Sequence, residues 1–369
     1  MHFGRGPLLV LLGPLLLLTA CGSGASSTAS SSSTTIPAVS NPAEQRKPQQ
    51  PSTLTPGVAI DIKGALASHT AVAAGNWADP FAFIDSGRIY TYATNTAGAN
   101  IPVAASNTDG TASYLGDAMP RLASWTHPGA VWAPSVYKRS DGTYVMFYDS
   151  LYGLTPLQCV GVATATSPAG PFVDSSDRPL VCPTDLGGAI DASMLAVDGT
   201  PWLVYKADGN CCNKPTSIWS VQLSSDLQST VGQPTKLLSN DQGWEGAVVE
   251  APSMVHVGGT FYLFYSGNDW STKDYAIGYA VCRSVTGPCS KPRSIAWGPS
   301  FSGFQGPGGA SFLTRDNSVD LGALKVGDDV AMVFHGWPQG KVDPKNGERE
   351  LFTSIVTFTP DGPTFATAQ

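Results

Sequence analysis

Three carboxylates, Asp79, Asp191 and Glu250, stand at similar places in a repeated sequence pattern. Carboxylates that meet in one site can do general acid–base chemistry, in which an ionised group activates water and a protonated one donates to a leaving group. Each acid taken alone is explained as readily as a turn residue that caps backbone donors. Glu245 is a rival for Glu250, but it lies outside the repeat, and we interpret it as a loop residue.

The repeat is marked by an alanine that recurs every 59 residues, at Ala133, Ala192, Ala251 and Ala310. After three of these motifs a Gly-containing turn leads into an aromatic run, at 141–148, 198–205 and 258–265. This pattern predicts strand–turn–strand hairpins. A weaker copy begins at Asp79.

The span from residue 75 to residue 369 holds five units of this length. One unit is too small to bury its own apolar face, so the units must stack around an axis. The sequence therefore predicts an all-β protein, a five-bladed β-propeller. The first strand of each blade lines the central channel, and the repeat position there reads Asp79, Trp132, Asp191, Glu250 and Gly309. Three acids in one ring repel one another, which a catalytic site explains better than a scaffold does.

Composition supports the all-β prediction and excludes other classes. The chain has 40 Gly and 29 Pro, only 13% charged residues and a net charge of -7. Beyond residue 70 it lacks a sustained apolar stripe at helical spacing, which argues against a barrel built on eight helices. It also lacks a strongly basic stripe, so nucleic acid is not an expected partner.

The N-terminus predicts export. Arg5 precedes an apolar run over residues 8–18 that is too short to span a bilayer. The run ends in Leu-Thr-Ala-Cys, which resembles a bacterial lipobox, so we expect a signal peptide over 1–20 and lipidation at Cys21. The alternative is an ordinary secretory signal. A Ser/Thr/Pro-rich linker over 21–70 and a catalytic domain over 71–369 follow. We therefore expect an extracytoplasmic protein that is anchored to the cell membrane by lipid, or secreted.

Six cysteines remain after Cys21, an even number that suggests disulfides in an exported chain. Their positions along the chain favour Cys282 with Cys289 and Cys159 with Cys182, leaving Cys211 with Cys212. Six cysteines allow 15 pairings, so the connectivity is an expectation only. Metal-ligand spacing is not apparent among them.

The motifs together resemble glycoside hydrolase family 43, pentosidases and arabinanases built on a five-bladed propeller. The matching segments cover nearly the whole chain after residue 75; they are 78–81, 131–135, 188–193, 249–253, 264–268, 306–311 and 334–336. The resemblance implies that Asp79 is the general base and Glu250 the general acid. Asp191 would orient that acid and tune its pKa. It also implies a monomer that needs no cofactor and acts on a polysaccharide or oligosaccharide.

Two further residues are candidates by the same resemblance. Trp132 would offer an apolar face to the sugar, although a packed core Trp is the plain alternative. His335 would contact a calcium or other ion bound in the channel, although a lone His is more often a satisfied core residue. Gly309 stands where relatives often have His, which argues against the ion.

The rival from another class is a non-catalytic polysaccharide-binding lipoprotein, but all three acids are present, which favours an enzyme. The related retaining fructosidases are set aside because their Asn-Asp-Pro-Asn signature is absent. The pentose, its linkage and exo or endo action stay open.

Overall fold

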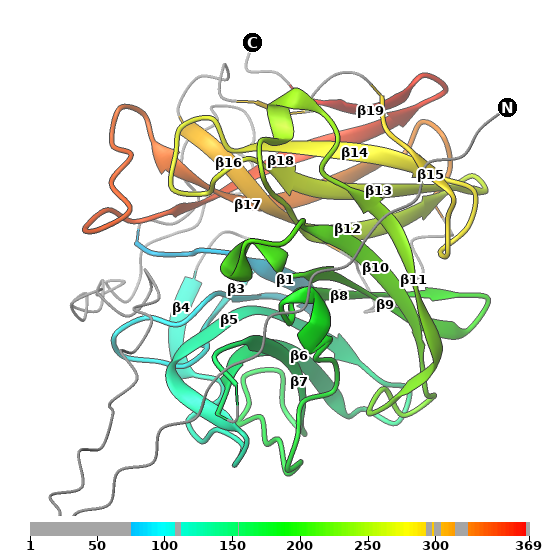
Figure 1. The fold of residues 1–369 in the computed structure, drawn as a ribbon. Coiled ribbons are helices and arrows are strands. Elements are labelled where there is room, and N and C mark those ends of the chain that lie inside the picture. The colour runs from blue at the N-terminus through cyan, green and yellow to red at the C-terminus, as the bar shows by residue number, and fades with distance from the viewer. Residues whose placement is uncertain are drawn as a thin grey trace, which may run out of the picture. The chain divides into compact units, whose positions relative to one another are not determined.

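The computed structural model describes residues 75–107, 112–153, 155–292, 297–298, 304–313 and 324–366. These residues form five antiparallel sheets and three short 3₁₀ helices, and the part of the chain so described contains no α-helix (Figure 1). The predicted five-bladed β-propeller is confirmed. No helix within these ranges is long and apolar enough to cross a membrane. The predicted signal peptide, Cys21 and the linker lie outside the described residues.

In every blade the inner strand comes first in the chain, and the later strands lie progressively further outward. Blade 1 contains β1 (Phe81–Asp85), β2 (Arg88–Tyr92), β3 (Pro102–Asn107) and β4 (Ala112–Asp117), and blade 2 contains β5 (Thr126–Lys138), β6 (Tyr144–Tyr152) and β7 (Gln158–Ala165). Blade 3 contains β8 (Ala189–Val197), β9 (Thr200–Ala207), β10 (Ser217–Leu223) and β11 (Thr230–Ser239). Blade 4 contains β12 (Val249–Val257), β13 (Thr260–Gly267), β14 (Ala276–Cys282) and β15 (Cys289–Ser290), and blade 5 contains β16 (Phe304–Phe312), β17 (Asp329–Pro338), β18 (Glu350–Thr359) and β19 (Gly362–Phe365). The 3₁₀ helices are η1 (Thr184–Leu186), η2 (Gly209–Cys212) and η3 (Gly243–Glu245).

Two-residue turns explain the predicted hairpins. Both residues of the turns Ser86–Gly87, Asp198–Gly199 and Gly258–Gly259 have positive φ, between 49° and 85°. Such turns match the twist of antiparallel strands, and they need residues that tolerate the left-handed region. The inner hairpins of blades 1, 3 and 4 therefore form where the sequence predicts them.

The inner strands share an irregularity at the channel. One residue with positive φ occupies the same place in each blade: Asp79, Ala133, Asp191, Ala251 and Gly309. We call these the bulge residues. In blades 2 to 5 the bulge residue stands two positions before a serine (Ser135, Ser193, Ser253 and Ser311), and in blade 1 it stands two positions before Phe81. The predicted ring is therefore wrong by one residue in blades 2 and 4, where Trp132 and Glu250 come just before the bulge. The prediction assumed that blades repeat every 59 residues, as the alanines do. Successive bulge residues are instead 54 to 60 residues apart, so the alanine spacing aligned positions that are not structurally equivalent.

Hydroxyl groups in the channel join neighbouring blades. Ser135 donates to the carbonyl of Ala192 at 2.6 Å, and Ser193 donates to that of Pro252 at 2.6 Å. Ser311 closes the ring by donating to the Pro80 carbonyl at 2.9 Å. Blades 5 and 1 thus meet without sharing a strand.

The core is divided among the blade interfaces. Five clusters of buried apolar side chains each bridge neighbouring blades, such as the one that joins Phe264 of blade 4 to Phe312 and Phe334 of blade 5. Because apolar burial supplies most of the driving force for folding, each blade depends on its two neighbours. The channel is left free for polar groups.

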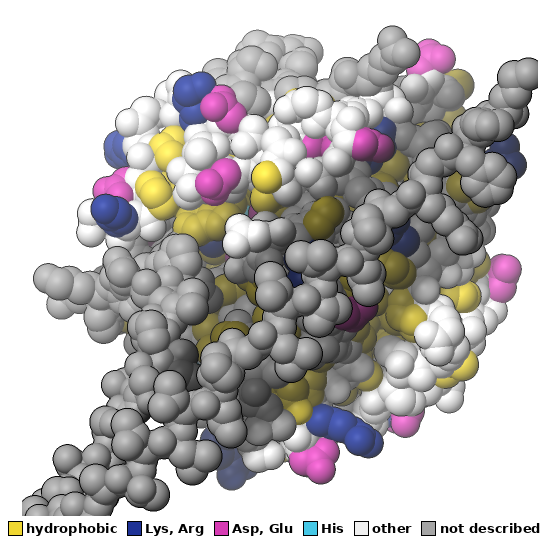
Figure 2. All heavy atoms as spheres, viewed as in Figure 1, with side chains coloured by type: hydrophobic (Ala, Val, Ile, Leu, Met, Phe, Trp, Pro, Cys, Tyr) yellow, Lys and Arg dark blue, Asp and Glu magenta, His cyan; other side chains and the backbone are white. Residues whose placement is uncertain are grey.

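All three predicted disulfides are confirmed: Cys159–Cys182, Cys211–Cys212 and Cys282–Cys289. On the face shown in Figure 2, Lys and Arg side chains are interspersed with Asp and Glu, and the described residues there form no continuous basic patch.

Candidate active site

One pocket lies where the inner strands of all five blades converge. Each blade supplies its bulge residue and the two residues that follow: 79–81, 133–135, 191–193, 251–253 and 309–311. Asp79 and Asp191 line this pocket directly. Glu250 directly precedes the bulge residue Ala251 and is 8% exposed. The fold therefore brings the three predicted acids to one end of the channel.

Asp79 is held as a carboxylate. Its Oδ2 accepts the hydroxyl of Thr94 at 2.6 Å, and its Oδ1 lies 3.2 Å from Nη1 of Arg349. Burial alone would raise the pKa of Asp79, but the charge of Arg349, the contact with His335 and the Thr94 hydrogen bond outweigh it and lower that pKa. An ionised carboxylate at the channel suits a general base.

His335 supports Asp79 from blade 5. Its Nδ1 accepts the backbone N–H of Asp79 at 3.0 Å, and its Nε2 lies 3.4 Å from Nη1 of Arg349. Burial first, and then the charge of Arg349, lower the pKa of His335 to about 3, so the ring is neutral at neutral pH. The expected channel ion does not fit this arrangement, because one ring nitrogen is engaged and the other faces a guanidinium. In the ranges that the structure describes, no group of three His, Cys, Asp or Glu side chains could hold a metal.

Asp191 is held between two blades. Its backbone N–H donates to Oδ2 of Asp149 at 2.9 Å, and its own Oδ2 accepts the N–H of Ala251 at 2.8 Å. Burial and the charge of Glu250 raise the pKa of Asp191 to about 8. A carboxyl with this pKa is mostly protonated at neutral pH.

Glu250 has a donor on each carboxyl oxygen. The hydroxyl of Tyr275 donates to Oε1 at 2.8 Å, and Nζ of Lys206 lies 2.8 Å from Oε2. Lys206 also contacts Asp208, with Nζ 3.0 Å from Oδ1. These contacts fix the orientation of the Glu250 carboxyl.

The rival Glu245 has a structural role. It is fully buried in η3, where its Oε2 accepts the backbone N–H groups of Asp241 and Gln242. Its Oε1 accepts the Tyr265 hydroxyl and lies 2.7 Å from Nζ of Lys291. Its oxygens are saturated within the protein, which agrees with its interpretation as a loop residue.

Sequence reasoning missed four residues whose side chains contact the carboxyl groups of the acids, namely Thr94, Lys206, Tyr275 and Arg349, and it also missed Asp149, which accepts the backbone N–H of Asp191. Lys206 had a detectable signal, because a Lys at the end of an aromatic strand, two residues before Asp208, is unexpected in a buried element. Arg349 had none, since nothing in its neighbourhood marks it as a partner of Asp79. Trp132 is half-buried at the channel end of blade 2, opposite Asp149 in the β5–β6 register.

The site can therefore separate protonation states. One carboxylate, Asp79, is kept ionised by a guanidinium, while a second carboxyl, Asp191, holds its proton in a buried position beside Glu250. Two titratable groups in one site whose pKa values are shifted in opposite directions are typical of a catalytic acid and base.

Comparison with known proteins gives the same picture. The family model described as glycosyl hydrolases family 43 matches residues 69–364. A probable arabinan endo-1,5-alpha-L-arabinosidase C of Aspergillus flavus is 26% identical over 258 residues, which are 64% of this chain and 78% of that relative. The arabinoxylan arabinofuranohydrolase of Bacillus subtilis is 29% identical over 194 residues, 45% of this chain and 34% of that relative.

Solved structures share the fold. A thermostable family-43 glycoside hydrolase has a TM-score of 0.66 at 25% identity, and the match covers 80% of this chain and 95% of that one. An endo-1,4-beta-xylanase from Bacteroides thetaiotaomicron has a TM-score of 0.63 at 25% identity, with 79% and 94% covered. These likenesses extend over the whole propeller.

Proposed function

Since the chain belongs to glycosyl hydrolase family 43, we propose that it is an inverting glycosidase that cleaves arabinofuranoside linkages in polysaccharides. Asp79 acts as the general base, Glu250 as the general acid, and Asp191 as the carboxyl that orients Glu250 and tunes its acidity. Among the relatives, both the Aspergillus and the Bacillus proteins carry names that refer to arabinose-containing polymers, which supports the choice of sugar.

The reaction needs two proton movements. Asp79, kept ionised by Arg349, removes a proton from a water molecule that attacks the anomeric carbon. As the bond to the leaving oxygen breaks, that oxygen keeps the bonding electrons and takes a proton from Glu250. Trp132 offers an apolar ring at the same mouth for a sugar face.

The observation that carries this proposal is the contrast between the two carboxyl environments. The pKa of Asp79 is lowered while that of Asp191 is raised to about 8. A polysaccharide-binding propeller would gain nothing from holding one carboxyl ionised and another protonated in the same site, because binding needs no proton transfer. The contrast therefore favours the enzyme over the non-catalytic alternative.

A substrate screen tests the proposal. Purified protein is incubated with linear arabinan, arabinoxylan, xylan and aryl pentosides, and the products are separated by chromatography. Release of arabinose or arabino-oligosaccharides supports the proposal, and their sizes distinguish exo from endo action. Release of only xylose or xylo-oligosaccharides would show that the substrate is a xylose polymer instead of an arabinose polymer. If no sugar is released from any of the four kinds of substrate, the proposed function is wrong.

We also propose that the protein is extracytoplasmic and lipid-anchored at Cys21. Three disulfides support a location outside the reducing cytoplasm. The lipobox-like sequence before Cys21 and the Ser/Thr/Pro-rich stretch after it would hold the domain at a distance from the membrane.

A further inference from the structure

Four side chains in the channel share one task. Each lies on the second strand of its blade, or just after it, and accepts the backbone N–H of the next blade's bulge residue at 2.9–3.1 Å. The acceptors are Thr94, Asp149, Ser266 and His335. A buried N–H needs such a partner, so these positions are built for acceptors.

The fifth equivalent position, in blade 3, holds Lys206, which cannot accept a hydrogen bond. It pairs with Ile190 as Asp149 pairs with Trp132 and Ser266 with Glu250. The N–H of Ala251, left without a partner from β9, donates to Asp191 instead. The pattern of hydrogen-bond acceptors is therefore broken next to Glu250, the proposed acid. Proteins tend to break their own structural rules at functional sites.

Lys206 is directed at Glu250. Its side chain is 1% exposed, and its Nζ lies 2.8 Å from Oε2 of Glu250 and 3.0 Å from Oδ1 of Asp208. A lysine this deeply buried is rare and costs free energy unless its charge is paired. The two carboxylates supply that pairing.

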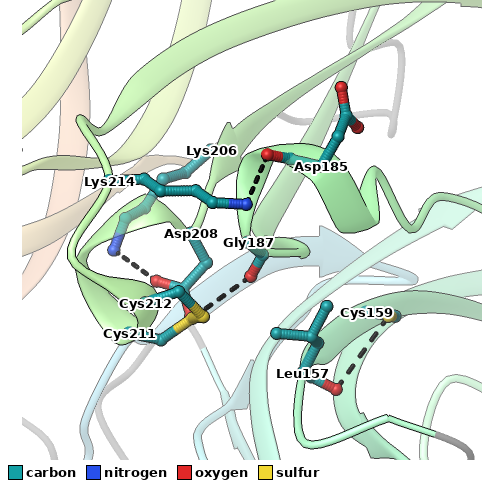
Figure 3. Close-up of a disulfide and its surroundings, with 9 residues drawn as sticks. All are labelled: Leu157, Cys159, Asp185, Gly187, Lys206, Asp208, Cys211, Cys212 and Lys214. Atoms are coloured by element: carbon teal, nitrogen blue, oxygen red, sulfur yellow. Dashed lines mark hydrogen bonds and ion pairs between the residues drawn. A yellow bond between two sulfur atoms is a disulfide. The ribbon is translucent and has the colours of Figure 1, made fainter. Parts of the chain in front are cut away.

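Asp208 is a fixed anchor for this ammonium group, as Figure 3 shows. Its N–H donates to the Gly188 carbonyl at 3.1 Å, and its own carbonyl accepts the N–H of Cys211 at 3.3 Å. The disulfide between Cys211 and Cys212 closes the adjoining turn, η2. Because the backbone is held on both sides, the carboxylate of Asp208 keeps Lys206 in place.

We propose that Lys206, anchored by Asp208, is a positioning residue for the proposed reaction. It fixes the Oε2 side of Glu250, and it stabilises the negative charge that Glu250 gains when it passes its proton to the leaving oxygen. This inference rests on the proposed function. It gives the acid step a cation that matters most once Glu250 is ionised, which is when differential stabilisation accelerates a reaction.

The charged and titratable groups that face this pair act in opposite directions. They are Asp79, Asp149, Lys206, Asp208 and Tyr275. Burial, Glu250 and Asp79 raise the pKa of Asp191, whereas Lys206 lowers it. Removing the cation should therefore raise the pKa of Asp191 and, with it, the pH at which the site loses its proton. Asp208→Asn keeps a side-chain oxygen that can accept from Nζ of Lys206 but removes the negative charge that offsets this cation, so it should lower that pH.

The test compares Lys206→Met with Asp208→Asn. In the profile of kcat against pH, the basic limb should move upward in Lys206→Met and downward in Asp208→Asn, each by about 0.5 units or more, the lower part of the range for a nearby charge. Lys206→Met should also lose ~10-fold or more in kcat on arabinan, but only a few-fold on a dinitrophenyl arabinofuranoside, whose leaving group needs no proton.

A matched control is Lys291→Met, which removes a second buried lysine that pairs with a glutamate, Glu245. It should lower the melting temperature and leave the pH profile unchanged. Shifts of the same sign in Lys206→Met and Asp208→Asn, or no shift in either, would overturn the inference.

A titration without substrate separates this inference from the proposed function. The ¹³C carboxyl signals of labelled Asp and Glu in the folded full chain should show the same opposite shifts in the two variants. If the wild type hydrolyses none of the substrates, the proposed function fails, and the titration alone then decides the role of Lys206. Asp208→Asn keeps the test decisive should Lys206→Met fail to fold.

Discussion

Arg349 and Asp79 lie 270 residues apart in the sequence, yet Nη1 of the arginine is 3.2 Å from Oδ1 of the aspartate. The contact joins blade 5 to blade 1, where the backbone N–H of Trp77 also donates to the Arg349 carbonyl at 2.7 Å. Closing the propeller therefore does more than complete the fold. It delivers the cation that keeps the proposed base ionised.

Replacing Arg349 with Met should raise the pKa of Asp79, because burial would then be opposed only by His335 and Thr94. A base with a raised pKa is protonated over a wider acidic range. The acidic limb of the profile of kcat/KM against pH should therefore move upward, by about 1 unit or more for an adjacent guanidinium. Arg349→Lys keeps the charge and should restore part of the shift. An unmoved limb in Arg349→Met would show that Arg349 does not set the ionisation of the base.

The acids themselves give the strongest expected effects. Asp79→Asn and Glu250→Gln should each leave a folded protein whose hydrolysis is reduced by at least ~100-fold, the usual scale for a lost acid or base. Asp191→Asn should also lower the rate. Glu245→Gln is the control, since its contacts are structural: it should lower the melting temperature and keep most of the turnover. Normal turnover in Glu250→Gln together with loss in Glu245→Gln would exchange the two assignments.

Tyr275 can be tested by removing one oxygen atom. Its hydroxyl donates to Oε1 of Glu250, and burial followed by the charge of Glu250 raises the pKa of Tyr275 well above 10, so it remains a donor at all working pH values. Tyr275→Phe should reduce kcat by about 10-fold, as expected for one hydrogen bond to a charged group. Tyr265→Phe removes the equivalent bond to Glu245 and should change the melting temperature only. Equal kinetics for both variants would contradict the role of Tyr275.

Anchoring predicts a separate outcome. Full-length protein produced in a bacterial host should partition into detergent and carry lipid on Cys21, because a diacylated cysteine supplies enough apolar surface for stable membrane attachment. The Cys21→Ala variant should remain unacylated or be released. Mass spectrometry of the mature N-terminus distinguishes a lipid anchor from a plain export signal, and an unmodified Cys21 would indicate the latter.

Much of the fold was predictable because its causes are local. The positive-φ turns need residues such as Gly199 and Gly259, and the aromatic strands follow them at once. Which residue of each inner strand faces the channel was not predictable in the same way, because it depends on where the bulge interrupts that strand. Ala133 and Ala251 are bulge residues, whereas Ala192 follows one, and the sequence does not distinguish these cases.

The site was predictable for the same reason only in part. Asp79 and Asp191 share the bulge position, so a repeat argument groups them. Glu250 joined this group in the prediction although it occupies the position before the bulge. Arg349 belongs to blade 5, and its contact with Asp79 of blade 1 arises from closing the ring. Tyr275 directly precedes β14 and reaches Glu250 across blade 4. No local sequence pattern encodes either contact.

The stereochemistry of the reaction follows from which blades carry the acid and the base. Asp79 belongs to blade 1 and Glu250 to blade 4, which are not neighbours in a ring of five. Each also has its own cation, Arg349 for Asp79 and Lys206 for Glu250.

Carboxyls placed in this way should stand about 6.5–9.5 Å apart, which leaves room for a water between the base and the anomeric carbon, instead of the ~5–5.5 Å needed for direct attack by a carboxylate. The water then enters on the face opposite the leaving group, so the configuration inverts. Proton NMR early in the reaction, before mutarotation, should show the inverted anomer first. A retained anomer, or transfer of the sugar to added methanol, would require a covalent intermediate, and Asp79 would then have to be the nucleophile instead of the base.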